Sequence, residues 1–354
     1  MNYLYKSLYC LSMVLLVGQS CQDNLKDKPG NGENPPTGVA TYVNPVFEPV
    51  LADPTVVQSG EYFYAYGTED NWGNEGGYKL VPIVRSKDLV TWEFVNNAFQ
   101  VKPNWKSEGG IWAPDVSFVD GKYRMYYSFS TWGDPNPGIG LAIADRPEGP
   151  FVDQGKVFLS QEIGVANSID PFFIREDQRD YLFWGSFFGI YAVELGPDGK
   201  QVIGDTVRIA HTHLEAALVT KKDGAYYFFG SAGSCCEGAN SSYRILVGKS
   251  DNLLGPYLDK QGNSISTGDH GELLLRGNAE AYGFAGPGHN AQVIEDDEGT
   301  AWMLYHAIPK INPRLSNGTN RRPLMLDKIT WSGGWPVVER QSPSLTTQPA
   351  PVFK

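Results

Sequence analysis

Short runs of alternating hydrophobic and polar residues recur along the chain, and glycine-containing turns separate them. A period of two residues is typical of strands that bury one face, whereas helical periodicity is not convincing anywhere in the chain. The pattern therefore predicts an all-β protein. Its clearest strand-like runs are 62–66, 123–127, 181–184, 226–229 and 302–305.

Five segments begin alike, with a carboxylate or imidazole residue ahead of a strand-like run and its glycine turn. The five opening residues are Asp53, Asp115, Asp170, Glu215 and His289. Their spacing is typical of four-stranded propeller blades with loops. The repeats predict a five-bladed β-propeller over residues 45–348. A β-sandwich with coincidental repeats is the alternative, but it gives no reason for each repeat to open on such a residue.

Composition agrees with this architecture and narrows the choice of partners. Aromatic residues make up 13% of the chain, which also has 40 glycines and 24 prolines. Aromatic side chains favour pleated strands, while glycine and proline favour turns. The net charge of −11 argues against a nucleic-acid partner, because phosphate binding needs a basic surface. That charge is compatible with a neutral polysaccharide or simply with solubility.

The N-terminal region has the character of an export signal. Lys6 precedes an apolar run, 8–17, that is too short to span a bilayer in a mature protein. Small residues before Cys21 resemble a bacterial lipobox, so we expect a signal peptide over 1–20 and lipidation of Cys21. Polar residues rich in Pro, Gly and Asn then predict a flexible tether over 21–44. Plain signal-peptide cleavage beside an incidental cysteine is the alternative.

The other cysteines predict no disulfide framework. Cys10 lies in the expected signal, whereas Cys235 and Cys236 are adjacent. Neighbouring cysteines form a bridge only with strain, and no zinc-binding spacing is present.

Radial repetition brings equivalent positions together, so Asp53, Asp170 and Glu215 are expected to meet at the propeller axis. Inverting hydrolysis of a glycosidic bond needs one carboxylate as base and one carboxylic acid as proton donor. A third carboxylate near the acid raises its pKa. A single Asp before Pro is more often a turn residue, but three carboxylate residues at equivalent positions of different repeats favour a shared site.

Several stretches of the chain resemble glycoside hydrolase family 43, the five-bladed propeller enzymes that act on arabinan and xylan. These stretches are 52–54, 111–115, 168–171, 214–216, 286–290 and 321–325, and together they extend over about residues 45–345. The resemblance implies that Asp53 is the general base, that Asp170 modulates the pKa of the acid, and that Glu215 is the general acid.

Two further stretches resemble the arabinanase-like members of the family. Residues 233–243 resemble their loop after the acid-bearing strand, and 286–289 resembles the segment whose histidine binds a metal at the axis. The resemblance implies a calcium ion with a shell of waters at His289, although a polar core residue is the alternative there. Ala52 and Ala217 depart from the common His and Pro without removing a reacting group, and the change at Ala52 weakens the case for endo action.

Sugar rings stack on aromatic faces and form hydrogen bonds through their hydroxyls. Trp112 lies beside the opening of the second repeat and is predicted to be a subsite platform, with Asn167 and Ser168 as further contacts just before Asp170. Weaker candidates, with loop packing or a surface position as the alternative, are Trp72, Trp132, His211 and His213.

The sequence therefore predicts an exported, lipid-anchored, monomeric hydrolase of α-1,5-linked arabinan, located at the outer membrane. An exo-acting arabinofuranosidase or β-xylosidase of the same fold is one alternative. A non-catalytic glycan-binding lipoprotein is another, although all three carboxylates are present. The role of Asp115 remains open between orienting a neighbour and capping its strand.

Overall fold

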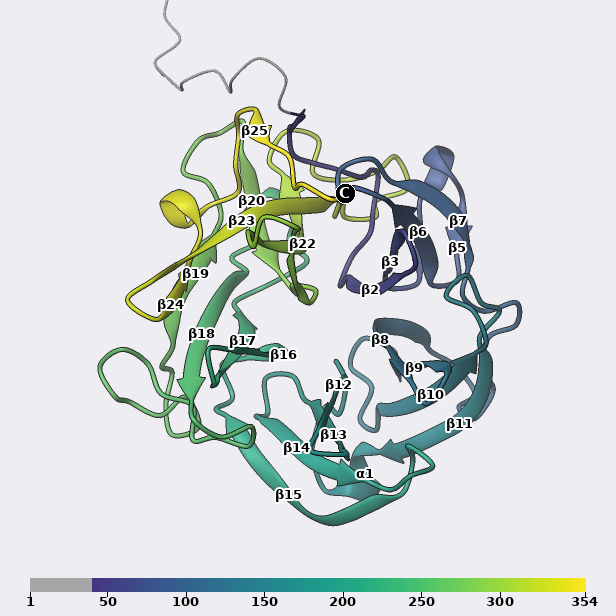
Figure 1. Cartoon of the computed structure of the whole chain (residues 1–354). Helices are drawn as coiled ribbons and strands as arrows, with labels where there is room; N and C mark the ends of the chain where they lie inside the picture. The colour runs from purple at the N-terminus through teal and green to yellow at the C-terminus, as the bar shows by residue number, and fades with distance from the viewer. Residues whose placement is uncertain (1–39) are drawn as a thin grey trace, which may run out of the picture. The chain divides into compact units, whose positions relative to one another are not determined.

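The computed structural model describes residues 40–354, and nearly all regular structure in them is β-strand (Figure 1). Five antiparallel sheets follow one another along the chain, four of them with four strands and the last with five. The predicted five-bladed β-propeller is therefore confirmed. The predicted signal peptide, Cys21 and the tether up to residue 39 lie outside the described residues.

Blades 2 to 5 are each built from consecutive strands, whereas blade 1 is interrupted by a hairpin of two short strands. Blade 1 contains β2 (Thr55–Ser59), β3 (Tyr62–Tyr66), β6 (Pro82–Ser86) and β7 (Glu93–Asn97). Blade 2 contains β8 (Gly110–Val119), β9 (Lys122–Ser130), β10 (Gly138–Ala144) and β11 (Val152–Leu159). Blade 3 contains β12 (Phe172–Glu176), β13 (Arg179–Trp184), β14 (Ile190–Leu195) and β15 (Val202–Ala210).

The remaining two blades complete the ring. Blade 4 contains β16 (Glu215–Lys222), β17 (Ala225–Ala232), β18 (Arg244–Ser250) and β19 (Glu272–Arg276). Blade 5 contains β20 (Phe284–Gly288), β21 (Val293–Glu295), β22 (Ala301–Pro309), β23 (Leu324–Ser332) and β24 (Trp335–Val337). Two short strands, β4 (Asp70–Asn71) and β5 (Tyr78–Lys79), form a hairpin within the first repeat.

Helical structure is confined to single turns. They are α1 (Ser160–Ile163), η1 (Gly73–Glu75), η2 (Gly238–Asn240) and η3 (Glu339–Gln341). Within residues 40–354, no helix has the length and apolar character needed to cross a membrane.

The hydrophobic core lies between neighbouring blades rather than in one central mass. Tyr126 of blade 2 stacks on Phe173 of blade 3, with ring centroids 5.5 Å apart and planes 10° apart. Tyr66 of blade 1 meets Phe151, which directly precedes β11, in an edge-to-face contact at 5.8 Å. These large flat side chains fill the wedge between twisted sheets, which accounts for the high aromatic content.

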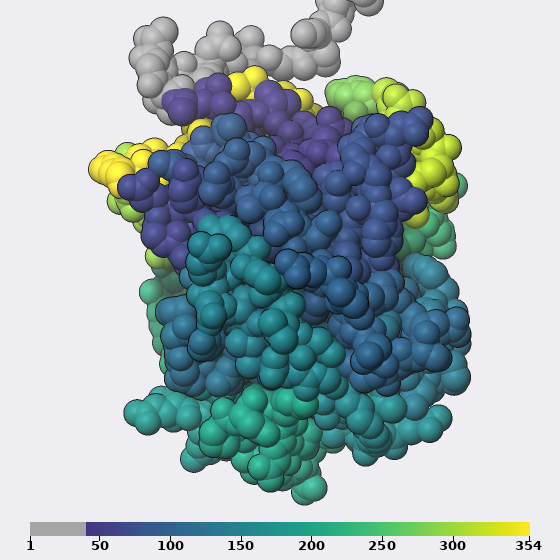
Figure 2. Space-filling view, turned by 90° about the vertical axis from the view of Figure 1, so that its right-hand side faces the viewer, coloured from purple at the N-terminus to yellow at the C-terminus, as the bar shows by residue number. Residues whose placement is uncertain are grey.

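The two ends of the described chain close the ring together. β1 (Thr41–Tyr42) pairs with β25 (Gln348–Pro349), and Figure 2 shows the purple and yellow atoms of these segments side by side. The side chain of Asn44 donates to the Leu326 carbonyl at 2.9 Å and accepts from the Leu326 N–H at 2.8 Å. The expectation that the tether extends to residue 44 was therefore wrong, because residues 41–44 contribute backbone pairing and a buried amide to the fold.

The first strand of each sheet faces the axis of the ring, as Figure 1 shows for β2, β8, β12 and β16. In blade 5 this inner strand is interrupted, because β20 and β21 both pair with β22 and His289 lies between them. Asp53, Asp170 and His289 have φ angles of 53°, 57° and 44°. Left-handed backbone is strained for side chains other than glycine and often marks functional positions.

Candidate active site

The residues that open the repeats all lie on the inner strands or next to them. Asp53 and Asp170 each lie two residues before the inner strand of their blade, and Glu215 is the first residue of β16. His289 Nδ1 lies 3.5 Å from Asp53 Oδ1, and the charges of Asp53 and Glu215 both raise the pKa of Asp170, so the four side chains share one site. The structure therefore brings together the three predicted carboxylates and the predicted imidazole.

Asp53 is surrounded by groups that favour its ionised form. Thr68 Oγ1 donates to its Oδ2 at 2.5 Å, and Arg322 Nη1 is 3.4 Å from both carboxylate oxygens. The Nδ1 atoms of His289 and His306 each lie 3.5 Å from Asp53 Oδ1. Burial alone would raise the pKa of Asp53, but the positive charge of Arg322 and the contact with His289 hold it well below its usual value.

His306 is a site residue that the sequence reasoning missed. Its Nδ1 accepts a hydrogen bond from the backbone N–H of Asp53 at 3.1 Å, and its fully buried ring stacks against Tyr243 at 6.0 Å. Burial lowers the pKa of His306 to about 3, so the ring is neutral and can accept this bond. Its place within the hydrophobic run of β22 concealed it from pattern analysis, because the run reads as an ordinary buried strand.

Glu215 is only 8% exposed and has two hydroxyl donors. Ser186 Oγ donates to its Oε2 at 2.6 Å, and Tyr243 OH donates to its Oε1 at 2.5 Å. Burial raises the pKa of Glu215, and the two hydrogen bonds oppose that rise without cancelling it. Glu215 therefore keeps its proton to higher pH than an exposed carboxyl, as a proton donor must.

Asp170 lies beside Glu215 and is buried as well. Its backbone N–H donates to Ser128 Oγ at 2.8 Å, which fixes the turn before β12. Burial raises the pKa of Asp170, the imidazole of His289 opposes this rise, and the negative charges of Glu215 and Asp53 add to it. Two neighbouring buried carboxyls resist full ionisation, so the pair keeps a proton to higher pH than an isolated carboxyl.

His289 occupies the break in the inner strand of blade 5. Its backbone N–H donates to Ser231 Oγ at 2.9 Å, and its side chain is mostly buried. Burial lowers the pKa of His289, but the contact with Asp53 and the charges of Asp170 and Glu215 outweigh this, and the net shift is upward. The imidazole therefore lies within a cluster of negative charge.

The fit of the predicted calcium ion to His289 is partial. In the described part of the chain, the one group of three potential ligands from His, Cys, Asp and Glu lies elsewhere. Calcium prefers six to eight oxygen ligands, so an ion beside His289 would take most of them from water. The surrounding carboxylates favour a cation there, and the calcium ion stays a prediction.

Asp115 has a structural role that joins several blades. Its Oδ1 accepts from Gln292 Nε2 at 2.8 Å and from Thr55 Oγ1 at 3.2 Å, and its Oδ2 accepts from the Phe173 N–H at 2.8 Å. These partners belong to blades 5, 1 and 3. Burial raises the pKa of Asp115 to about 6. This residue therefore ties inner strands together rather than capping its own strand.

The three predicted sugar contacts have different environments. Trp112 is half-buried, and its ring lies 5.8 Å from that of Trp132, which is 80% exposed, so the pair offers an aromatic surface. Asn167 is half-buried and donates to the Ser186 carbonyl at 3.0 Å. The prediction for Ser168 was wrong, because its fully buried hydroxyl donates to Val165 and accepts from Trp184.

Two other sequence interpretations change in the structure. Trp72 is buried against Phe47 and Phe94, so it packs the loop rather than facing a ligand.

The expectation of no disulfide was wrong, because Cys235 and Cys236 are joined to each other. The bridge lies in a loop that is also held by blade 5, because Asn320 Nδ2 donates to the Cys236 carbonyl at 3.0 Å.

Further site residues went unassigned although the sequence contained a signal for two of them. Arg322 lies in one of the stretches that resemble the family, and Tyr243 ends another. Neither residue type by itself indicates contact with a particular carboxylate. Ser186 gave no signal, because its role depends on the turn after β13 reaching Glu215.

Comparisons with known proteins support the family resemblance found in the sequence. The model of glycosyl hydrolases family 43 matches residues 42–336. An extracellular endo-α-(1→5)-L-arabinanase of Bacillus subtilis is 32% identical over 81% of this chain and 87% of the relative. An extracellular exo-α-(1→5)-L-arabinofuranosidase of Cellvibrio japonicus is 28% identical over 82% and 86%. A Cellvibrio cellulosa α-L-arabinanase solved with arabinohexaose superposes with a TM-score of 0.72 at 28% identity, over 83% and 97% of the two chains.

Proposed function

This chain belongs to glycosyl hydrolase family 43 and is a glycoside hydrolase, and on that premise we propose that it hydrolyses the α-1,5-linked L-arabinofuranosyl bonds of arabinan with inversion of configuration. Support for the substrate comes from relatives with both sequence and structural similarity, which are named as arabinan-cleaving enzymes. Support for the reaction comes from the opposed proton affinities of Asp53 and Glu215.

The mechanism follows from those two environments. Asp53 is kept ionised by Arg322 and Thr68, so it accepts a proton from the attacking water. Glu215 keeps its proton through burial and donates it to the leaving glycosidic oxygen. Asp170 is a positioning residue, because its negative charge beside Glu215 disfavours ionisation of the acid.

An activity assay in solution, with two readouts, tests this function. The protein is incubated with linear α-1,5-arabinan, with xylan alongside, and the products are separated while proton NMR follows the anomeric configuration of the first product. Release of arabino-oligosaccharides with inverted configuration is expected. Retention of configuration, or release from xylan alone, would contradict the proposal.

Exo action is the second candidate, because an exo-acting arabinofuranosidase is among the similar proteins. The same assay separates the two modes of action. A ladder of oligosaccharides identifies an endo enzyme, whereas arabinose as the first and only product identifies an exo enzyme.

We also propose that a hydrated calcium ion binds at His289, where it would screen the charge of the three neighbouring carboxylates. The support is the negative surroundings of this imidazole. Calorimetric titration of chelator-treated protein with calcium tests it. One bound ion in the wild type and none in His289→Ala is expected, and unchanged binding in the variant would contradict it.

Export as a monomeric lipoprotein of the outer membrane remains a proposal, since residues 1–39 lie outside the described part. Its support is the lipobox-like sequence before Cys21, together with relatives that are named extracellular. Labelled palmitate is expected to be incorporated into the wild type and not into Cys21→Ser. Equal labelling of the two would contradict the anchor.

A further inference from the structure

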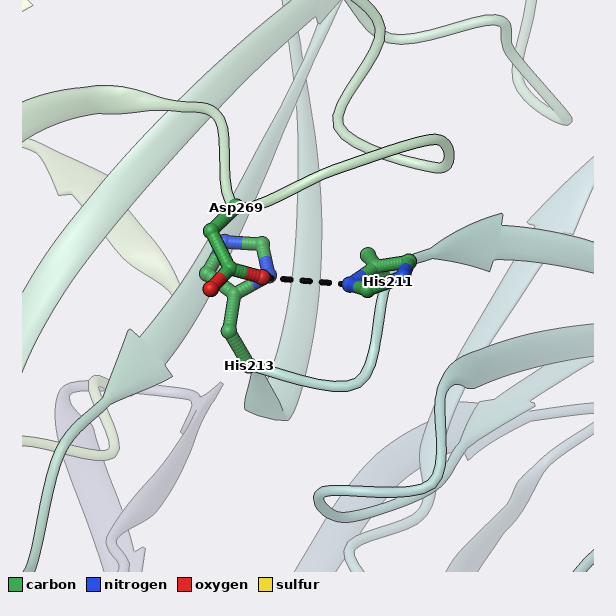
Figure 3. Close-up of side chains that lie close together, drawn as sticks. All are labelled: His211, His213 and Asp269. Carbon is green, nitrogen blue, oxygen red and sulfur yellow. Dashed lines mark hydrogen bonds and ion pairs between the residues drawn. The ribbon is translucent and has the colours of Figure 1, made fainter.

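Three metal-ligating side chains converge at the junction of blades 3 and 4, as Figure 3 shows. His211 and His213 lie in the turn from β15 to β16, and Asp269 lies in the segment between β18 and β19. The Nδ1 atoms of the two histidines are 3.1 and 3.3 Å from Asp269 Oδ1. The function proposed above assigns no role to this cluster.

The protonation of His213 is set by a backbone contact. Its Nε2 lies 3.0 Å from the carbonyl oxygen of His270, which can only accept, so Nε2 must carry a proton. Its Nδ1 is buried and has no hydrogen-bond partner, although it faces the Asp269 carboxylate. In the neutral ring, a nitrogen lone pair and a carboxylate oxygen face each other, and a cation between them would remove the repulsion.

A carbonyl that fixes the tautomer of a histidine is the usual outer partner of a metal-bound imidazole. A tetrahedral ion with bonds of about 2.0–2.1 Å has neighbouring ligand atoms about 3.3 Å apart. The two measured separations from Asp269 Oδ1 are close to that length. Two nitrogen ligands and one oxygen ligand favour a divalent transition metal over calcium or magnesium, which prefer oxygen.

We propose that His211, His213 and Asp269 bind a divalent transition-metal ion, with zinc as the best fit. The fourth position is open to water, because Asp269 is 73% exposed whereas His213 is only 11% exposed. The two segments are already aligned, since the backbone N–H of His211 donates to the Ile265 carbonyl at 2.7 Å. The ion therefore enters a site whose ligands need little rearrangement.

The position of this site gives the ion a structural role. It fastens the segment between β18 and β19 to the turn that leads into β16, where His213 lies two residues before Glu215. A ligand that binds only the folded state stabilises it, and the gain grows with the logarithm of the ligand concentration relative to its dissociation constant. Zinc is therefore expected to raise the melting temperature of the protein, independently of its substrate.

The test uses the full chain after treatment with a chelator that is then removed by dialysis. Zinc binding is measured by calorimetry, and cobalt is substituted as a visible reporter of coordination geometry. Asp269→Asn and His211→Gln are the test variants. His270→Gln is the matched control, because only the backbone of that neighbouring histidine takes part.

We expect one zinc site that is lost in both test variants and kept in the control, with the intense visible bands of tetrahedral cobalt in the wild type. We also expect zinc to raise the melting temperature of the wild type and the control only. Absence of zinc binding in the wild type would identify the cluster as an ordinary ion pair and overturn the proposal. Equal binding and equal thermal shifts in Asp269→Asn would overturn it too.

Discussion

The two sides of the catalytic cluster contain the same kind of group in opposite environments. Around the Asp53 carboxylate the protein places a guanidinium, a threonine hydroxyl and the imidazole of His289, while the neutral ring of His306 accepts from the Asp53 backbone N–H. Around Glu215 it places two hydroxyls and otherwise relies on burial, with another carboxyl, Asp170, beside it. A carboxylate near fixed positive charge loses its proton, and one in a dry pocket near another carboxylate keeps it. The difference supports the proposed base, Asp53, and a protonated carboxyl within the Asp170–Glu215 pair as the acid.

Removing either reacting group should have the largest effect. Asp53→Asn and Glu215→Gln should each lower kcat on arabinan by about 10²–10⁴-fold, the usual contribution of general acid–base groups. Circular dichroism and the melting temperature check that the fold is intact. Turnover near that of the wild type in either folded variant would contradict the assignment.

Removing the positive charge of Arg322 should reduce the difference in pKa between Asp53 and Glu215 by raising the pKa of Asp53. In Arg322→Gln the pKa of Asp53 rises, so its protonation begins at higher pH. The acidic limb of the kcat/KM profile should therefore move upward by ~1 pH unit or more, as expected for the loss of an adjacent opposite charge. Arg321→Gln is the control, because Arg321 pairs with Glu75 at 2.6 Å rather than with Asp53. Equal profiles for the two variants would refute the role of Arg322.

Removing the charge of Asp170 should reduce the same difference in pKa by lowering the pKa of Glu215. The charge of Glu215 raises the pKa of Asp170, and because this repulsion is mutual, Glu215 should lose its proton at lower pH once the Asp170 charge is gone. The basic limb of the kcat profile should move downward in Asp170→Asn, with the acidic limb less affected. A basic limb that stays in place, together with lower kcat, would assign Asp170 a purely structural role.

Removing the Tyr243 hydroxyl should slightly increase the difference in pKa between Asp53 and Glu215. Tyr243→Phe deletes a hydrogen bond that favours ionised Glu215, so the pKa of Glu215 should rise. The basic limb then moves upward by less than about 1 pH unit, opposite to its shift in Asp170→Asn. A shift in the same direction as that variant would show that Tyr243 acts mainly by packing.

The sequence predicted the parts of this site that repeat. Asp53, Asp170, Glu215 and His289 occupy equivalent positions in their repeats, so strand periodicity and the count of five indicated their convergence. His306 escaped notice because its neighbours in β22 form a continuous hydrophobic run that is typical of any buried strand. Its contact with Asp53 joins residues 253 positions apart, and no local pattern records that.

The wrong predictions have a related cause. Ser168 is adjacent to a site residue in sequence, but its hydroxyl turns inward to Trp184. Residues 41–44 look like linker by composition, yet the ring closes through them because the partner strand β25 supplies the missing contacts. Composition and adjacency report local character, whereas exposure and pairing depend on the whole ring.

The central claim is that Glu215 donates the proton and Asp53 activates water, and a leaving-group experiment tests it most directly. The rates of Glu215→Gln and Asp53→Asn are compared on arabinan and on a dinitrophenyl glycoside of an α-1,5-linked arabino-oligosaccharide, whose leaving group needs no proton. Glu215→Gln should recover near wild-type rates on the activated substrate alone, while Asp53→Asn stays impaired on both. Recovery of Asp53→Asn instead, or equal losses for both variants on both substrates, would contradict the account.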